Sequence, residues 1–398
     1  MKKLFLVMLC IGAFSVSNYA QIEAPKFGKG IRILGKDSTY YSKIGYRFQN
    51  LYVGSWTLDD GLSDYEASFL VRRMRLKFDG WLVNPKIKYK LELALSNRDN
   101  SGGSGAEFRK AANIVLDASI AYNFYKNFTI QFGQRKLPSN RERVISSGNL
   151  QFVDRSRLNS RYNIDRDVGL QLLHHHTIGE NFLIREIIAL SQGEGRNVTE
   201  GYFGGFNYTY RVEFLPFGEF SGKGDYVGSA IKYETKPKLS LAVSYDNNNN
   251  AVRERGQLGS FITASDGSYV GRDLNTLFID MMFNYKNISI MGEYAHKTAA
   301  DNSPIVYDEN DEIIGTYFTG TGFNIQGGYM FANDWELAAR YTTITPDVVV
   351  GDKEDQYTFG INKFVVGHKL KIQTDFTWIK NANKLDNFVW RTQVDVHF

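Results

Sequence analysis

The stretch YEASFLVRRMRLKFDGWL, residues 65–82, decides the fold of this chain. Successive side chains of a β-strand point to opposite faces, so a strand with one buried and one wet face shows alternating apolar and polar residues. The apolar positions are Leu70, Met74, Leu76, Phe78 and Leu82, and the opposite positions are Val71, Arg73, Arg75, Lys77 and Asp79. The stretch therefore predicts a long strand with an apolar and a charged face, and it places Arg72 on the apolar side.

The same alternation fills the rest of the chain. It recurs over residues 87–95, 114–124, 206–214, 239–245, 277–285, 323–331, 335–341, 357–361, 370–378 and 390–398. No comparable stripe at the helical period accompanies it. The sequence therefore predicts an all-β protein.

The lengths of strands and connections favour a transmembrane antiparallel β-barrel over a soluble β-sandwich. Many predicted strands have ten or more residues, whereas strands of globular proteins have about 5 to 6; about 9 to 11 residues cross a bilayer in a tilted barrel. Tight turns alternate with long polar loops, the pattern of outer-membrane barrels. Residues 225–234 form either a further strand or part of a periplasmic turn over 215–237; we choose the turn, which gives about sixteen strands and an aqueous channel.

Composition agrees with an exported barrel. The chain has 398 residues, 14% of them aromatic, with 37 Gly and only 7 Pro. This composition excludes a disordered or collagen-like chain. The formal net charge of +4 says little about partners, and we expect no nucleic-acid partner.

The first twenty residues predict a cleaved secretory signal peptide. Lys2 and Lys3 precede an apolar run from Leu4 to Phe14, which is followed by a small, polar end up to Ala20. Such a run is too short for a spanning helix. We expect Gln21 to be the first mature residue, a short N-terminal segment over 21–40, and the barrel over 41–398. The mature chain then contains no cysteine.

The C-terminus ends a strand on Phe398. A terminal aromatic residue resembles the signal that the barrel assembly machinery of Gram-negative bacteria reads. Together with the signal peptide and the alternating strands, it predicts location in the outer membrane, in contact with its lipid.

Several short motifs resemble the phosphate-selective porin O and P family. They lie in order along the chain: GYRF at 45–48, RRMRL at 72–76, GQRKLP at 133–138, LQFVDRS at 150–156, RDVG at 166–169, RVE at 211–213, PFG at 216–218, GYMF at 328–331 and residues 337–341. The resemblance implies a sixteen-strand, trimeric porin whose third extracellular loop, near 138–166, folds inward. It also implies an anion preference, with phosphate or polyphosphate as candidate substrates.

The charges on the lumen parity divide the predicted wall into two parts. Strands one to five carry mostly cations: Lys43, Arg47, Arg73, Arg75, Lys77, Lys88, Lys90 and Arg135, against Asp79, Glu92 and Asp117. Later strands carry more acids: Glu213, Asp280, Glu293, Glu336, Asp375 and Asp395, against Arg211, Arg340, Lys371 and Arg391. Residues 135–168 hold eight basic and four acidic residues.

A cationic constriction raises the local anion concentration. The candidate pore-lining and anion-binding residues are Arg47, Arg73, Arg75, Lys77, Lys88, Lys90, Arg135, Arg141, Arg143, Arg155 and Arg157. The alternative is that these arginines form salt bridges with acids of the same loop or of the wall.

Other motifs give weaker evidence of a functional site. In the run 174–176, only His174 and His176 can share a face of a strand, so a solvated cluster is a simpler interpretation than a metal site. Residues 308–312 imitate the start of a calcium loop but lack its glycine, and no nucleophile elbow is present.

We therefore expect a porin that needs no enzyme activity, no cofactor and no metal. The alternatives are a general diffusion porin and a non-conducting adhesin or structural barrel. Conductance in a planar bilayer separates a channel from a non-conducting adhesin or structural barrel.

Overall fold

The computed structural model describes residues 21–23, 26–100, 113–198 and 203–398. The expected signal peptide, residues 1–20, lies outside the described residues. No helix within the described ranges is long and apolar enough to cross a membrane.

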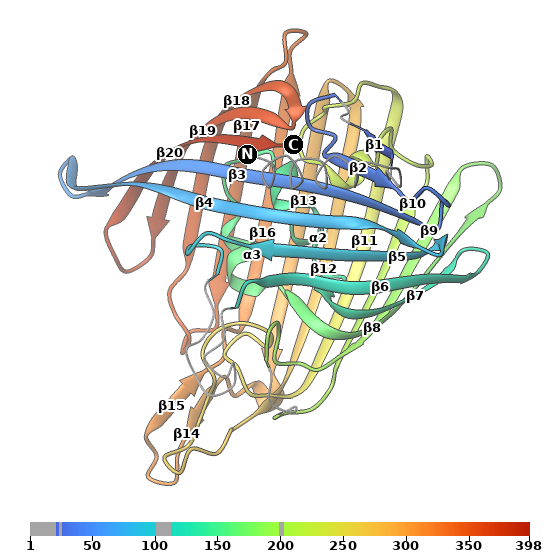
Figure 1. Cartoon of the computed structure of the whole chain (residues 1–398). Helices are drawn as coiled ribbons and strands as arrows, with labels where there is room; N and C mark the ends of the chain where they lie inside the picture. The colour runs from blue at the N-terminus through green and yellow to red at the C-terminus, as the bar shows by residue number, and fades with distance from the viewer. Residues whose placement is uncertain (1–20, 24–25, 101–112, 199–202) are drawn as a thin grey trace, which may run out of the picture.

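Sixteen antiparallel strands form a closed barrel, which confirms the predicted fold and strand number (Figure 1). They are β3 (Tyr40–Leu58), β4 (Leu62–Leu82), β5 (Asn84–Ala94), β6 (Val115–Tyr125), β7 (Phe128–Lys136), β8 (Arg166–Ile178), β9 (Phe182–Ser191), β10 (Asn207–Leu215), β11 (Glu234–Ala251), β12 (Arg272–Lys286), β13 (Ile288–Ala299), β16 (Gly320–Met330), β17 (Trp335–Pro346), β18 (Glu354–His368), β19 (Leu370–Asn381) and β20 (Asp386–His397). Apolar side chains such as Phe132, Ile188 and Phe323 remain exposed on the outer face, as a lipid-facing wall requires.

The barrel closes where the last strand pairs with the first long one. Residues 386–397 of β20 pair with residues 47–58 of β3. The remaining N-terminal part of β3, residues 41–44, pairs with the short strand β2 (Ile31–Leu34), which in turn pairs with β1 (Gln21–Glu23). The N-terminal strands therefore extend the sheet beside the closure.

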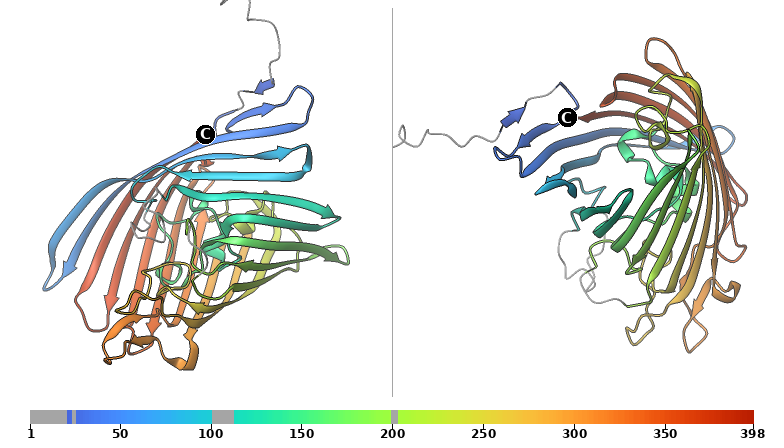
Figure 2. Two further views of the ribbon diagram at one scale, coloured as in Figure 1. Left: turned by 60° about the horizontal axis from the view of Figure 1, so that its bottom comes forward. Right: turned by 90° about the vertical axis from the view of Figure 1, so that its right-hand side faces the viewer.

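Most short turns lie at one end of the barrel and most long connections at the other (Figures 1 and 2). The exceptions are the short connections 59–61 and 382–385 at the second end and the long connection 216–233 at the first. The 300–319 connection carries η4 (Ala300–Asn302) and the hairpin of β14 (Ile305–Tyr307) and β15 (Ile313–Thr316). Following the usual orientation of outer-membrane barrels, we call the end with the short turns periplasmic.

The connection between β10 and β11 contains no strand; its regular element is η3 (Gly224–Tyr226). It turns back into the barrel, where Phe220 is buried against Leu215 and Met282. The Gly228 amide donates to the Asn149 carbonyl at 2.7 Å. The segment therefore supports the third loop from the periplasmic side.

A β-bulge changes the face of Arg72. Gln49 pairs with Arg73 whereas Asn50 pairs with Val71, so Arg72 is the extra residue of β4. A bulge re-aims side chains, and Arg72 reaches Asp154 of the third loop at 3.1 Å. The predicted lipid-facing parity of Arg72 was therefore wrong, because strict alternation holds only in an unbulged strand.

The third extracellular connection, residues 137–165, which we call the third loop, lies inside the ring of strands (Figure 2). It contains α2 (Arg141–Val144), η2 (Ser147–Asn149) and α3 (Arg157–Tyr162). Its apolar side chains pack on inward-facing residues of the wall in two clusters: Leu137, Leu158, Tyr162 and Ile164 with Ala189, Phe278, Ala295 and Ile344, and Ile145 and Leu150 with Leu183, Leu215, Met282 and Met291. The hydrophobic effect thus holds the loop against β9 to β17.

Glycine in the wall makes room for this packing. A Cβ atom on Gly360 of β18 would lie 3.0 Å from the ring of Phe152. The loop therefore lies close to the wall at this point.

Candidate functional site

The third loop is bonded to the acidic wall. Asp280 of β12 accepts from Arg141 Nε at 3.0 Å and from Arg211 Nη1 at 2.7 Å. Glu213 of β10 lies 3.3 Å from Arg141 and 2.8 Å from Arg211. All four side chains are buried. Two arginines therefore match two carboxylates, and this part of the wall offers no unpaired charge to the channel.

The next acids along the wall bind polar groups of the loop. Glu293 Oε1 accepts from Asn140 Nδ2 at 3.0 Å and from the Glu142 amide at 2.6 Å. Glu336 accepts from Gln151 Nε2 at 2.8 Å, and Asp375 accepts from the Val153 amide at 3.1 Å. Asp375 also pairs with Arg391 at 2.7 Å. The loop thus covers these carboxylates.

Asp395 reaches the loop through Arg47. The carboxylate lies 2.7 Å from the Arg47 guanidinium. Arg47 Nη1 also donates to Ser147 Oγ at 2.7 Å. Each of the six acids predicted on the lumen face of the later strands is therefore occupied by the loop, by a wall cation or by both.

On the opposite wall, cations outnumber the acids that they share. Glu92 of β5 pairs with Arg75 at 2.9 Å and with Lys77 at 3.4 Å. Lys90 lies within ion-pair distance of both Glu92 and Asp117, and Arg166 lies 2.8 Å from Asp117. Four cations thus share the two wall carboxylates Glu92 and Asp117, and Arg75 and Arg166 also have partners in the connections, Asp99 and Asp165. This wall keeps a surplus of positive charge.

Two cationic cavities lie beside the loop, one of about 500 Å³ towards the long extracellular connections and one of about 520 Å³ below it. Another, of about 930 Å³, is lined largely by residues of β3 and β4 and borders the loop at Asp154. Among the described residues, twelve arginines and three aspartates line the outer cavity. Ten lysines and arginines line the inner cavity, against Glu92 and Asp117. Both cavities are therefore strongly cationic.

The two cavities meet at four arginines, which line both: Arg75 of β4, Arg143 and Arg155 of the loop, and Arg166 of β8. Arg75 also binds Asp99 at 2.7 Å, and Arg143 pairs with Asp165. A solute that passes between the cavities meets this group, which we call the arginine junction.

Arg155 is the member of the junction with no carboxylate partner among the described residues. It donates to the carbonyls of Glu142 at 2.8 Å and Ile145 at 2.9 Å. Burial and the charges of Arg75 and Arg166 lower the pKa of Arg155 to about 10. Because burial and neighbouring cations destabilise the charged guanidinium of Arg155, an anion close to it stabilises that charge.

Lys136 of β7 has similar surroundings. Its ammonium donates to the carbonyls of Arg143 at 2.7 Å and Ile145 at 3.0 Å. It lines the inner cavity together with Arg135, which forms no ion pair within the described part of the chain. These two cations extend the positive surface below the junction.

The structure separates the eleven candidate residues into three groups. Arg73, Arg75, Lys77, Lys90, Arg135, Arg143, Arg155 and Arg157 line one or both cavities. Arg47 and Arg141 are buried anchors between the loop and the wall, and Lys88 is exposed near the periplasmic end of β5. Arg47, Lys88 and Arg141 are absent from the described lining of the two cavities.

Sequence reasoning did not select several cavity-lining cations: Arg72, Arg98, Lys136, Arg166, Arg196, Arg253, Arg255 and Arg391. Arg166 and Lys136 are among the eight basic residues of 135–168, but the sequence alone does not single them out as sites. Arg253 and Arg255 lie in another long connection, and only the fold brings them over the third loop, where Arg255 donates to the Ser160 carbonyl at 2.9 Å.

The calcium-like stretch at 308–312 has a local structural role. Asp308 Oδ1 accepts from the amides of Asn310 at 2.8 Å and Glu312 at 2.9 Å. These bonds form a turn. The arrangement does not resemble a calcium loop.

Comparison with known proteins agrees with the barrel. The family model described as phosphate-selective porin O and P matches residues 39–389. Among solved structures, OmpF of Salmonella typhi, solved with daunomycin, has a TM-score of 0.57 at 11% identity, and the comparison covers 92% of this chain and 100% of that one. An anion-selective porin from Comamonas acidovorans has a TM-score of 0.53 at 9% identity, over 90% and 99% of the two chains. OmpT of Vibrio cholerae, described in its trimer form, has a TM-score of 0.50 at 11% identity, over 89% and 99%.

Proposed function

Because the chain belongs to the phosphate-selective porin O and P family, and is an outer-membrane porin by family and fold, we propose that it prefers anions, with inorganic phosphate or polyphosphate as candidate substrates. The family and fold indicate a channel rather than an enzyme. One observation carries the proposal: the loop occupies the acidic wall and leaves cations around both cavities.

The electrostatic effect is large enough to set selectivity. Two unit charges 4 Å apart interact by about 4 kcal/mol at an effective dielectric constant of 20, before the desolvation of the ion is subtracted. A remainder of about 1.4 kcal/mol changes occupancy tenfold. Because a permeating ion must also leave, several moderate sites in series suit transport better than one tight site. The succession of arginines from the outer cavity through the junction has this form.

The reversal potential of the purified protein in a planar bilayer tests the proposal. In a KCl gradient we expect the sign of an anion-selective channel, and in potassium phosphate we expect a phosphate current. A cation-selective wild-type channel would contradict the proposal and favour a general diffusion porin. Absence of conductance from folded protein would favour an adhesin or structural barrel.

We also propose that the chain assembles as a homotrimer, in line with the trimer form described for the OmpT structure. Cross-linking in native membranes should then give a band at three times the mass of the chain. A band at the mass of the single chain alone would contradict it.

We also propose that the chain is exported with a cleaved signal peptide and is assembled through its terminal aromatic residue. Cleavage after Ala20 should give Gln21 at the N-terminus of the mature protein, which mass spectrometry can check. Removal of Phe398 should lower the outer-membrane yield, since the terminal aromatic residue is the proposed contact with the assembly machinery. An intact Met1 in the membrane fraction would contradict the signal peptide.

A further inference from the structure

A polar group of three side chains lies on the outer face of the barrel, close to the periplasmic turn between β8 and β9. His174 and His176 share the parity of Leu170 and Leu172 on β8, whose side chains are 43% and 37% exposed. Glu186 of β9 has the parity of Ile188, which is 49% exposed. The three residues therefore interrupt an apolar, lipid-facing surface at the membrane interface.

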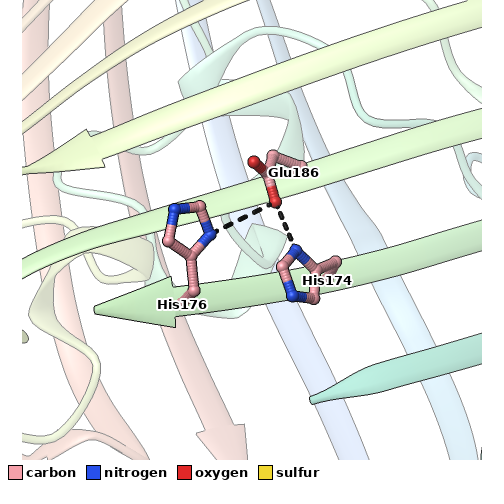
Figure 3. A group of neighbouring side chains, drawn as sticks. All are labelled: His174, His176 and Glu186. Carbon is pink, nitrogen blue, oxygen red and sulfur yellow. Dashed lines mark hydrogen bonds and ion pairs between the residues drawn. The ribbon is translucent and has the colours of Figure 1, made fainter. Parts of the chain in front are cut away.

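The register of the two strands brings the three side chains together (Figure 3). His174 stands directly opposite Glu186 in the antiparallel pair. Its Nδ1 lies 2.6 Å from Glu186 Oε2, and His176 Nδ1 lies 3.7 Å from the same oxygen. One ligand atom from each residue falls within 4.8 Å of the others. The atoms are thus near the separations that a single tetrahedral ion requires.

Neighbouring rings orient the histidines. The ring of Phe128 stacks on His174 with centroids 4.0 Å apart and planes 19° apart. The two imidazoles are themselves stacked at 5.4 Å. The Nδ1 atom of His176 is shielded from solvent and has no hydrogen-bond partner. Buried polar atoms normally have a hydrogen-bond partner, so His176 Nδ1 is free to bind a further group.

We propose that His174, His176 and Glu186 bind a divalent transition-metal ion, with Zn²⁺ as the best match and water in the fourth position. Two imidazoles and one carboxylate are a common donor set for zinc. The Nδ1 atom of His176 donates its lone pair to the ion, and the positive charge of the ion compensates the carboxylate, which is costly on a lipid-facing surface. It also joins β8 to β9, since His174 and Glu186 form a residue pair of the two strands four pairs in from Ile178 and Phe182, the last pair before the turn.

Zinc titration of the refolded, detergent-solubilised mature protein tests the site, with a chromophoric chelator as competitor. The mature chain contains no cysteine, so no thiolate competes for the ion. We expect one Zn²⁺ per chain. His174→Ala, His176→Ala and Glu186→Gln should each weaken binding more than about tenfold, because even partners outside the first ligand shell are worth 10- to 100-fold.

His175→Ala is the matched control. It belongs to the same histidine run, but it has the parity of Leu173, which lines the inner cavity. Its zinc affinity should equal that of the wild type. Zn²⁺ should also raise the unfolding temperature of the wild type and of the control, but not that of Glu186→Gln, which keeps the size of the side chain.

Absence of stoichiometric binding by folded wild-type protein would overturn the proposal, and the histidines would then form only ion pairs with Glu186. Equal loss of affinity in the His175 control would also overturn it. Channel selectivity is measured separately and does not depend on either result.

Discussion

The two walls of this barrel differ in how their charges are used. On the later strands, Glu213 and Asp280 meet matched arginines in fully buried pairs. On the earlier strands, Glu92 alone is shared by Arg75, Lys77 and Lys90. The acidic wall is therefore a docking surface for the loop, and cations of the basic wall are left facing the cavities. The position of the loop, more than the net charge of the chain, therefore determines which sign of charge faces the channel.

The largest effect should come from reversing the basic wall. Replacing Arg73, Arg75 and Lys77 together by Glu lowers the charge of this wall by six units, and the reversal potential in a KCl gradient should move toward the cation side. Replacement of the same three by Gln lowers the charge by three units and should move the potential about half as far. Lys88→Glu, outside both cavities, is the control and should leave the potential nearly unchanged. An unchanged reversal potential in the folded triple Glu variant would contradict the assignment of the basic wall to the anion path.

Removing an anchor of the acidic wall should cost stability. Arg141→Gln leaves Asp280 and Glu213 short of one buried partner, and loss of one member of a buried pair costs about 3–5 kcal/mol. The free energy of unfolding should fall by that amount, and single-channel conductance should rise as the loop loosens.

Arg157→Gln is the matched loop variant for this prediction. Arg157 pairs with Glu354 at 3.1 Å and its side chain is 42% exposed. Such a pair contributes about 0–1 kcal/mol. Similar losses of stability in both variants would contradict the assignment of Arg141 as an anchor.

A smaller effect is expected at the arginine junction. Arg155→Gln removes the charge that has no carboxylate partner, so the ratio of anion to cation permeability should fall by up to about tenfold, equivalent to 1.4 kcal/mol. Arg161→Gln serves as the control, since Arg161 stacks on Phe318 with its guanidinium 4.0 Å from the ring centroid and does not line the described part of either cavity. An unchanged ratio of anion to cation permeability in Arg155→Gln would mean that selectivity arises elsewhere than at the arginine junction.

The smallest effect is that of salt on the wild type. The Debye length falls from about 10 Å at 0.1 M to about 3 Å at 1 M. The anion preference should weaken severalfold over this range, but persist in part because the junction is buried. An anion preference that does not change with salt concentration would indicate direct binding of the anion instead of attraction by a long-range electrostatic field.

The alternating pattern was enough to predict the barrel, because lipid outside and water inside impose opposite polarity on neighbouring residues of every strand. It also predicted the basic and acidic walls, since parity places charges before any contact is known. Parity failed at Arg72, where one extra residue in the strand turns the side chain towards Asp154. A bulge depends on cross-strand pairing, which the sequence of one strand does not contain.

The sequence by itself therefore determined the wall: its strands, its two faces and the sign of charge along each part. Only the tertiary structure decided the use of those charges. Arg141 and Arg155 lie fourteen positions apart in one loop, yet Arg141 is buried between Asp280 and Glu213 while Arg155 faces both cavities. Glu186 joins His174 and His176 in the same way, through the register of two strands. Charges are local properties of residues, but their partners are set by contacts between distant segments, and those contacts exist only in the closed barrel.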